Sequence, residues 1–141
     1  MMKELDRLVT LEIAIKLKKI GYWSENGCKY GWFKRKRGKE WELLPLTSEN
    51  FIACWKFLFA PTLEETRKWI RDNFKYYPEV TAYKYIDIDS ILYDVELYQG
   101  SRYSKVRVTT VGARFNDKRE AYIQGILIAF RYNERYSKSK I

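Results

Sequence analysis

Hydrophobic residues recur every three or four positions in two segments of the chain, the spacing of one face of an α-helix. The first segment runs from Leu11 to Ile20, between the candidate N-cap Thr10 and Gly21, a residue type that often ends a helix in the left-handed conformation. The second runs from Leu63 to Phe74, where Thr62 opens a capping-box pattern. Both patterns predict a helix.

Alternating hydrophobic and polar residues indicate three strands in the second half of the chain. The strands span Val80 to Ile88, Ile91 to Tyr98 and Tyr103 to Val111. In the third, Val106 and Val108 are expected to point inward. Each strand therefore has one face suited to burial.

A turn at Gln99–Arg102 joins the last two of these strands and fixes their expected register. With this turn, Glu96 lies opposite Lys105, and Asp94 lies opposite Arg107. Opposite charges at such cross-strand positions stabilise a sheet. We expect a ladder of charge pairs on its solvent face.

A hairpin is indicated between Cys28 and Leu44, with Phe33 opposite Trp41 if residues 36–38 form a short turn. The next stretch, residues 47–59, fits either a short helix or an irregular apolar loop. In both cases Trp55 is expected to pack onto the core.

Asn116 is a candidate N-cap for a last helix that extends through Phe130, although a strand stays open for Tyr122 to Phe130. The element order is then α-ββ-α-βββ-α. This order predicts an α+β fold, in which helices pack on one face of an antiparallel sheet. We expect a single domain over residues 1–136 and a polar tail over residues 137–141.

Composition restricts the class of protein. Hydrophobic residues make up 46% of the chain and charged residues 32%, the balance of a soluble globular domain. The uncharged run from Ala121 to Phe130 is about half of what a membrane span needs. The N-terminus lacks the pattern of a secretory signal. We expect no membrane contact and a cytoplasmic location, which is the host cytoplasm if a phage encodes the protein.

The chain has no histidine and only two cysteines, Cys28 and Cys54. This excludes imidazole-based catalysis and a zinc site of the usual ligands within one copy. The thiols are interpreted as small packing groups, with a disulfide as the minor alternative. No metal and no cofactor are expected, and we expect a non-enzymatic protein.

The formal net charge of +9 points to an anionic partner. Five basic residues lie within six positions at the expected hairpin tip, between aromatic residues. Basic groups bind phosphates and aromatic rings stack on bases, so this composition suits a nucleotide or nucleic acid. The candidate ligand-binding residues are Lys34, Arg35, Lys36, Arg37, Trp32 and Trp41 at the hairpin, and Arg131 and Arg135 near the C-terminus. The alternative is a solvated hairpin tip whose charges keep the exposed strands from pairing with other chains.

Asp87 and Asp89 form the best candidate for a metal-binding carboxylate pair. Paired carboxylates can hold Mg²⁺ for phosphodiester cleavage. Asp89 followed by Ser90 also reads as a turn, which is the favoured interpretation.

Two sequence blocks, Leu8 to Tyr22 and Ala60 to Arg71, resemble the signature blocks of small uncharacterised proteins from phages and prophages of Bacteroidales. In that family a glycine-ended helix begins the chain, a helix starting at A-P-T-L follows, and a C-terminal helix closes it. The resemblance implies a viral accessory protein of unknown function, for which anti-defence is one role. It implies no catalytic residues.

Three functions follow from these observations. The preferred one is non-enzymatic binding of a phosphate-rich ligand, either a nucleotide signal sequestered in counter-defence or a nucleic acid. The alternatives are inhibition of an acidic host protein and a small Mg²⁺-dependent nuclease. A homo-oligomer is left open.

Overall fold

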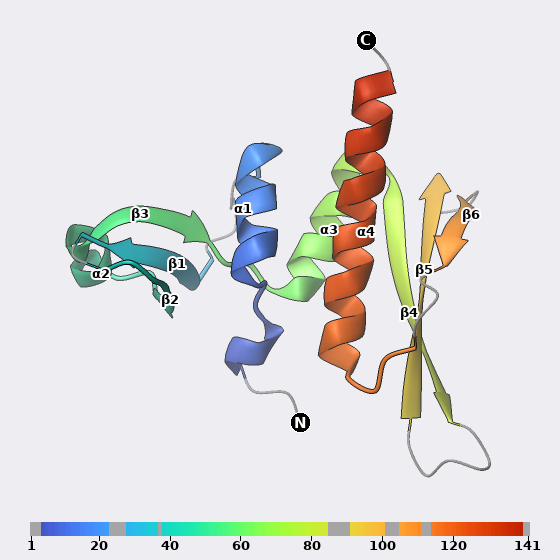
Figure 1. Cartoon of the computed structure of the whole chain (residues 1–141), viewed down its shortest axis with the longest axis horizontal. Coiled ribbons are helices and arrows are strands. Elements are labelled where there is room, and N and C mark those ends of the chain that lie inside the picture. Colours follow the sequence, from blue (N-terminus) through green and yellow to red (C-terminus); the bar gives the residue numbers. More distant parts are fainter. Residues whose placement is uncertain are drawn as a thin grey trace. The chain divides into compact units, whose positions relative to one another are not determined.

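Residues 4–22, 28–36, 38–84, 91–100, 105–110 and 114–139 are described by the structure, a computed structural model. The chain divides into two compact units, Met1–Thr62 and Leu63–Ile141. Each unit contains one antiparallel three-stranded sheet with helices (Figure 1). The predicted α+β class is confirmed. The described strands form two separate sheets, whereas the sequence suggested one.

The first unit contains the 3₁₀-helix η1 (Glu4–Arg7), α1 (Leu11–Lys19), β1 (Tyr30–Arg35), β2 (Trp41–Pro45), α2 (Ser48–Ala53) and β3 (Cys54–Phe59). Thr10 caps α1 as predicted, since its side-chain oxygen accepts a hydrogen bond from the backbone N–H of Ile13 at 3.3 Å. Gly21 follows the helix with a φ of 85°. The stretch that the sequence left undecided contains both α2 and β3.

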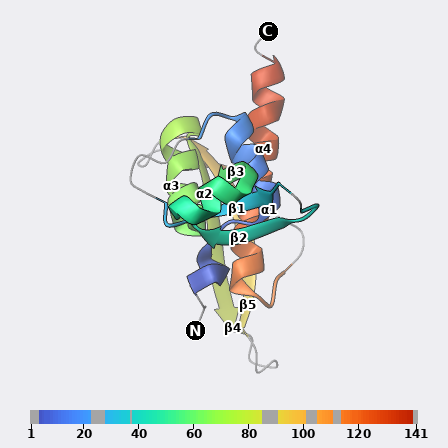
Figure 2. The same cartoon turned by 90° about the vertical axis from the view of Figure 1, so that its left-hand side faces the viewer.

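The sheet of the first unit has the order β2-β1-β3, with β1 in the centre (Figure 2). The predicted hairpin is present as the β1–β2 pair. Its register differs by one residue from the prediction, because Lys34 and not Phe33 lies opposite Trp41. On the other side of β1, Lys34 lies opposite Lys56 of β3. A bulge follows Lys34 in this second pairing.

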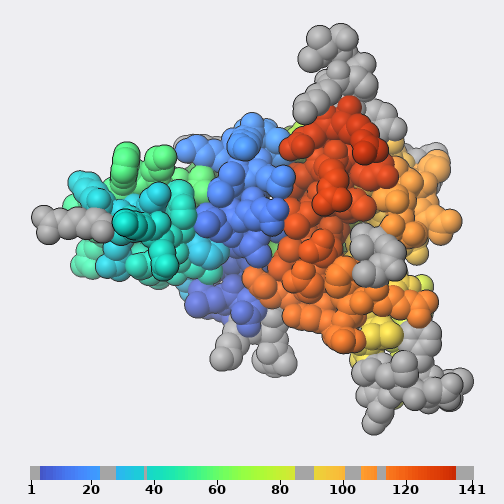
Figure 3. Space-filling view, viewed as in Figure 1, coloured from blue at the N-terminus to red at the C-terminus, as the bar shows by residue number. Residues whose placement is uncertain are grey.

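Different elements cover the two faces of this sheet. On one face the buried ring of Phe33 packs against Phe51 of α2, with ring centroids 5.4 Å apart. On the other face the indole N–H of Trp32 donates to the carbonyl of Val9 at 3.1 Å. Leu58 is also buried there, beside α1. The atoms of α1 and of the three strands form one contiguous body (Figure 3).

The second unit contains α3 (Leu63–Phe74), β4 (Tyr76–Lys84), β5 (Ile91–Gly100), β6 (Lys105–Thr110) and α4 (Lys118–Ser139). The bounds of α3 agree with the prediction. The last segment is a helix and not a strand. Asp117 caps it instead of Asn116, since its carboxylate accepts the N–H of Arg119 at 2.9 Å. The helix also continues to Ser139, where a polar tail was expected to begin at residue 137.

In this unit both helices lie on one face of the β4-β5-β6 sheet, as predicted (Figure 1). Val95 and Leu97 of β5 are buried on that face, and Ile126 of α4 is buried with them. A Cβ atom at Gly125 would lie 3.2 Å from side-chain atoms of Pro78 and Val95. The glycine therefore allows α4 to pack closely on the sheet.

The register predicted for β5 and β6 is wrong. Lys105 lies opposite Gly100 and Arg107 lies opposite Tyr98, each four positions along β5 from its expected partner, so Glu96 does not lie opposite Lys105. A bulge between Leu97 and Tyr98 shifts the pairing by one further residue, which puts Glu96 opposite Thr110. Val106, which was expected to point inward, lies on the edge strand β6 and is 72% exposed.

The acidic residues of β5 have other partners than the predicted ones. Asp94 forms an ion pair with Arg114 at 3.3 Å and not with Arg107. Glu96 accepts a hydrogen bond from the hydroxyl of Tyr98 at 2.7 Å and lies 3.9 Å from Arg107. The hydrogen bond to the Glu96 carboxylate, with smaller contributions from burial and nearby acids, raises the pKa of Tyr98. These acids therefore have structural roles in the sheet.

Candidate functional site

Two lysines and a tryptophan meet on one face of the first sheet. Lys34 on β1 lies directly between Trp41 on β2 and Lys56 on β3. Side chains that lie opposite each other in antiparallel strands point to the same face. Neither lysine forms an ion pair with any described residue. Their charges are therefore not neutralised within the described part of the chain.

The remaining basic residues of the hairpin differ in their surroundings. The guanidinium of Arg35 lies 3.2 Å from the carboxylate of Glu42, in an ion pair that is about half exposed. Lys36 is exposed in the turn, where its backbone N–H donates to Ala53 at 3.3 Å. Arg37 lies outside the described residues. Lys34, Lys36 and Lys39 are thus the described hairpin cations without an ion-pair partner among the described residues.

The two tryptophans predicted to stack on a ligand have different environments. Trp32 is half-buried, and its N–H holds the segment that precedes α1 through Val9. Trp41 is also half-buried and lies beside Lys34. Trp32 consequently contributes to the fold, whereas Trp41 belongs to the lysine-bearing face.

Trp55 is the aromatic residue that the sequence placed wrongly. It was expected on the core, but 68% of it is exposed. The ammonium of Lys56 lies 5.5 Å from the centroid of its ring. The bulge at this end of the β1–β3 pairing breaks the simple alternation that would have put Trp55 on the same side as Phe57.

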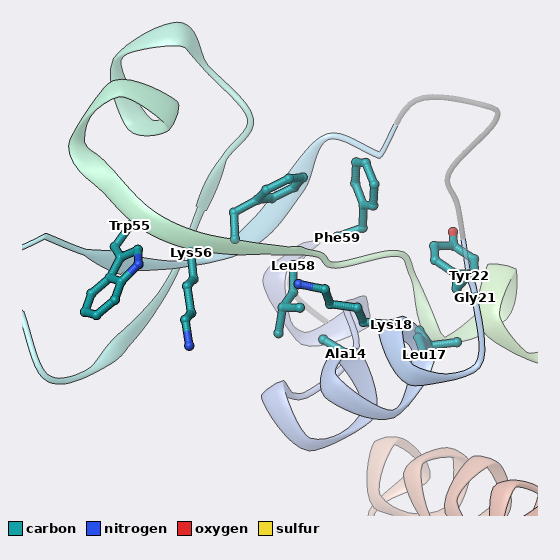
Figure 4. A pocket seen from close by; sticks show the side chains of 10 residues that line it. Ala14, Leu17, Lys18, Gly21, Tyr22, Trp55, Lys56, Leu58 and Phe59 are labelled. Atoms are coloured by element: carbon teal, nitrogen blue, oxygen red, sulfur yellow. The ribbon is translucent and has the colours of Figure 1, made fainter.

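A groove of about 520 Å³ runs beside β3, and all its lining residues belong to the first unit. Its apolar residues include Ala14 and Leu17 of α1 and Leu58 of β3. Lys18 extends from α1 toward Leu58, and Lys56 points from β3 to the same side as Leu58 (Figure 4). The complete lining consists of Ala14, Leu17, Lys18, Gly21, Tyr22 and residues 55–59.

The C-terminal candidates Arg131 and Arg135 are exposed residues of α4. The guanidinium of Arg135 lies 5.8 Å from the ring centroid of Tyr132. Neither arginine forms an ion pair with a described residue. They belong to the second unit, whereas β1, β2 and β3 belong to the first.

The candidate metal ligands Asp87 and Asp89 lie outside the described residues. Within the described ranges, no three histidine, cysteine, aspartate or glutamate side chains are grouped so that they could hold a metal ion. Cys28 and Cys54 are both half-buried thiols, and the Cys54 thiol donates to the carbonyl of Phe51 at 3.2 Å.

Comparisons of the chain with protein-family models, with curated proteins and with solved structures find no match. None of the described helices has the length and hydropathy that crossing a bilayer requires. A functional assignment therefore rests on the geometry of the lysine-bearing face and the groove.

Proposed function

We propose that this protein binds a phosphate-rich ligand, a nucleotide or a nucleic acid, without turning it over. The observation that supports this most directly is the placement of Lys34 opposite Lys56. Like charges at directly opposite positions destabilise a sheet. A phosphate between the two ammonium groups would remove this repulsion and form charge-assisted hydrogen bonds with both.

Aromatic residues flank the lysine pair on both sides. Trp41 lies next to Lys34 across the hairpin, and Trp55 lies next to Lys56. Nucleic-acid-binding surfaces combine cations that contact phosphates with rings that stack on bases. The surface has both groups within one sheet, which favours a nucleotide ligand over an anion without a base.

The two sequence blocks that resemble phage proteins suggest a biological setting for this activity. In an accessory protein of a phage, the ligand would be a nucleotide signal of host defence, which the protein would sequester, or a nucleic acid. Both ligands present phosphates and bases, so the same surface serves either one.

The proposal predicts that removing the lysine pair weakens binding. In the double variant Lys34→Gln, Lys56→Gln, each lost phosphate contact removes about 1.5–3 kcal/mol, so affinity should fall at least tenfold. For a nucleic acid, the slope of log affinity against log salt should also become shallower by about one for each contact. Fluorescence anisotropy with labelled ATP and with a labelled short oligothymidine, measured over a range of salt, tests both effects.

The matched control is the double variant Lys68→Gln, Lys84→Gln, which removes the same charge from exposed positions of the second unit. It should retain nearly all of the affinity. Equal losses in the two variants would show that only net charge matters and would contradict a site at the lysine pair. Failure of the unaltered protein to bind either probe would contradict the proposed function itself.

A further inference from the structure

The groove beside β3 has the dimensions of a small-ligand site. Its volume of about 520 Å³ falls within the range of about 300–1,000 Å³ that is usual for such sites. The side chains of Ala14, Leu17 and Leu58 are buried and give it an apolar floor (Figure 4). A flat apolar group that enters it would be removed from water on one side.

Trp55 of β3 offers an aromatic ring beside the groove. Phe57 and Phe59 point to the other face of the sheet, where they pack edge to face with ring centroids 5.0 Å apart. Trp55 lies at the other end of the strand and is largely exposed. A large exposed ring beside an apolar groove offers a face on which a nucleic-acid base can stack.

Charge gives the groove a preference for one kind of aromatic ligand. Lys18 reaches it from α1 and Lys56 from β3, and none of its lining residues is acidic. Neither lysine has an ion-pair partner among the described residues. An aromatic ligand with an anionic group therefore fits better than a neutral or cationic one.

The helix α1 also favours one orientation of such a ligand in the groove. Gly21 lines the groove directly after α1, so the carbonyl end of the helix, its negative pole, borders the site. This pole disfavours a chain of phosphates at that end of the groove. The phosphates are favoured at the other end, where Lys56 continues to Lys34 across the sheet.

We infer that this groove is the base-binding subsite of a nucleoside phosphate. The base lies along the apolar floor and against Trp55, and the phosphates lie between Lys56 and Lys34. The inference rests on the proposed function and adds the ligand class and its orientation. A free nucleotide and the end of a single strand share this chemistry.

The test measures binding of three probes to variants of Trp55. The probes are ATP, a short oligothymidine and inorganic tripolyphosphate, which has the phosphates of ATP but no base. In Trp55→Ala, affinity for the probes that contain a base should fall about tenfold to a hundredfold, while affinity for tripolyphosphate stays unchanged. Trp55→Phe keeps an aromatic face and should retain most of the affinity.

Two readouts keep a folding defect from imitating this result. The melting temperature of each variant shows whether the fold is intact, and the unchanged affinity for tripolyphosphate shows that the lysines remain in place. Base stacking should also quench the tryptophan fluorescence of the unaltered protein, and this quenching should be lost in Trp55→Phe.

Unchanged affinity of Trp55→Ala for both ATP and oligothymidine would overturn the inference. If Lys34→Gln, Lys56→Gln still weakened binding in that case, the proposed function would stand without the groove. Trp55-dependent binding of ATP would identify a free nucleotide as the ligand. Trp55-dependent binding of oligothymidine alone would identify a strand.

Discussion

Lys34 and Lys56 place like charges opposite each other on one face of the first sheet. Close to them, Trp55 exposes most of its ring to solvent. Both features reduce the stability of the unbound protein, because like charges repel across strands and exposed apolar surface orders water. Both would be relieved by a nucleotide, whose phosphates bind cations and whose base covers an aromatic ring.

Gly31 permits close contact at the centre of the same sheet. A Cβ atom there would lie 2.9 Å from both the backbone oxygen of Leu58 and a side-chain carbon of Leu46. We therefore predict that Gly31→Ala lowers the free energy of unfolding by about 1–3 kcal/mol, the usual cost of overpacking a core. Urea denaturation followed by circular dichroism measures this change.

Gly38→Ala is the control for this substitution. A Cβ atom at Gly38 would meet its nearest neighbour, Cβ of Arg35, at 3.4 Å, an ordinary contact distance. Its stability should change by less than about 0.5 kcal/mol. Equal stability of Gly31→Ala and the unaltered protein would contradict the tight packing between β1 and β3.

Single residues of the candidate site could be predicted only in part. Lys34 and Trp41 lie in a run whose composition alone marks it as basic and aromatic. Lys18, Lys56 and Trp55 come together only through the contact of α1 with β3 and the pairing of β3 with β1. No local pattern encodes those contacts, so sequence reasoning could not identify the groove.

The helices were predictable because their end signals are local. The cap at Thr10 and the start of α3 depend on residues within one helical turn, and the structure agrees with both. The register between β5 and β6 depends instead on how far the two strands continue toward their connection, and Gly100 pairs with Lys105. Charge pairing favoured a register four residues away from this one, and Glu96 lies opposite Thr110.

The hairpin of β1 and β2 allows a test of how its charges act together. Glu42 pairs with Arg35 across these strands at 3.2 Å. Glu42→Gln removes a negative charge from the basic hairpin and leaves Arg35 without this carboxylate, so the positive potential around Lys34 should rise. We predict about twofold to fivefold tighter binding of ATP or oligothymidine, with a loss of stability of at most about 1 kcal/mol, since exposed ion pairs contribute little.

The matched substitution is Glu64→Gln, which breaks the ion pair of Glu64 with Arg67 in the second unit and changes the net charge equally. It should leave the affinity for either probe unchanged. Isothermal titration of both variants measures the difference. Weaker binding of Glu42→Gln would indicate that the Arg35 ion pair orders the hairpin for its ligand.

At the scale of the whole chain, the order of helices and strands was sufficient to predict the α+β class. It was not sufficient to predict two sheets. In the first unit, β3 pairs with the far side of β1 after β2 and α2 have intervened, and this pairing closes a three-stranded sheet. Such non-local pairing depends on tertiary packing and not on the alternation within a strand.

The cations around the groove are all lysines, and the chain has no histidine. Histidine is the side chain whose ordinary pKa lies between pH 5 and 8, whereas lysine and arginine as residue types stay charged throughout that interval. The protonation of a bound phosphate can change there instead, because a terminal phosphate gains its second negative charge near pH 6.

We therefore predict that affinity for ATP rises as the pH increases through about 6, while affinity for an oligothymidine without terminal phosphates stays level. Binding measured from pH 5 to pH 8 at constant salt tests this difference. A sigmoidal change for the unphosphorylated strand would contradict it. When the cations that bind the ligand keep their charge, the shape of the pH profile becomes a chemical signature of the ligand. It separates ligands with a terminal phosphate from phosphodiesters before the natural ligand is isolated.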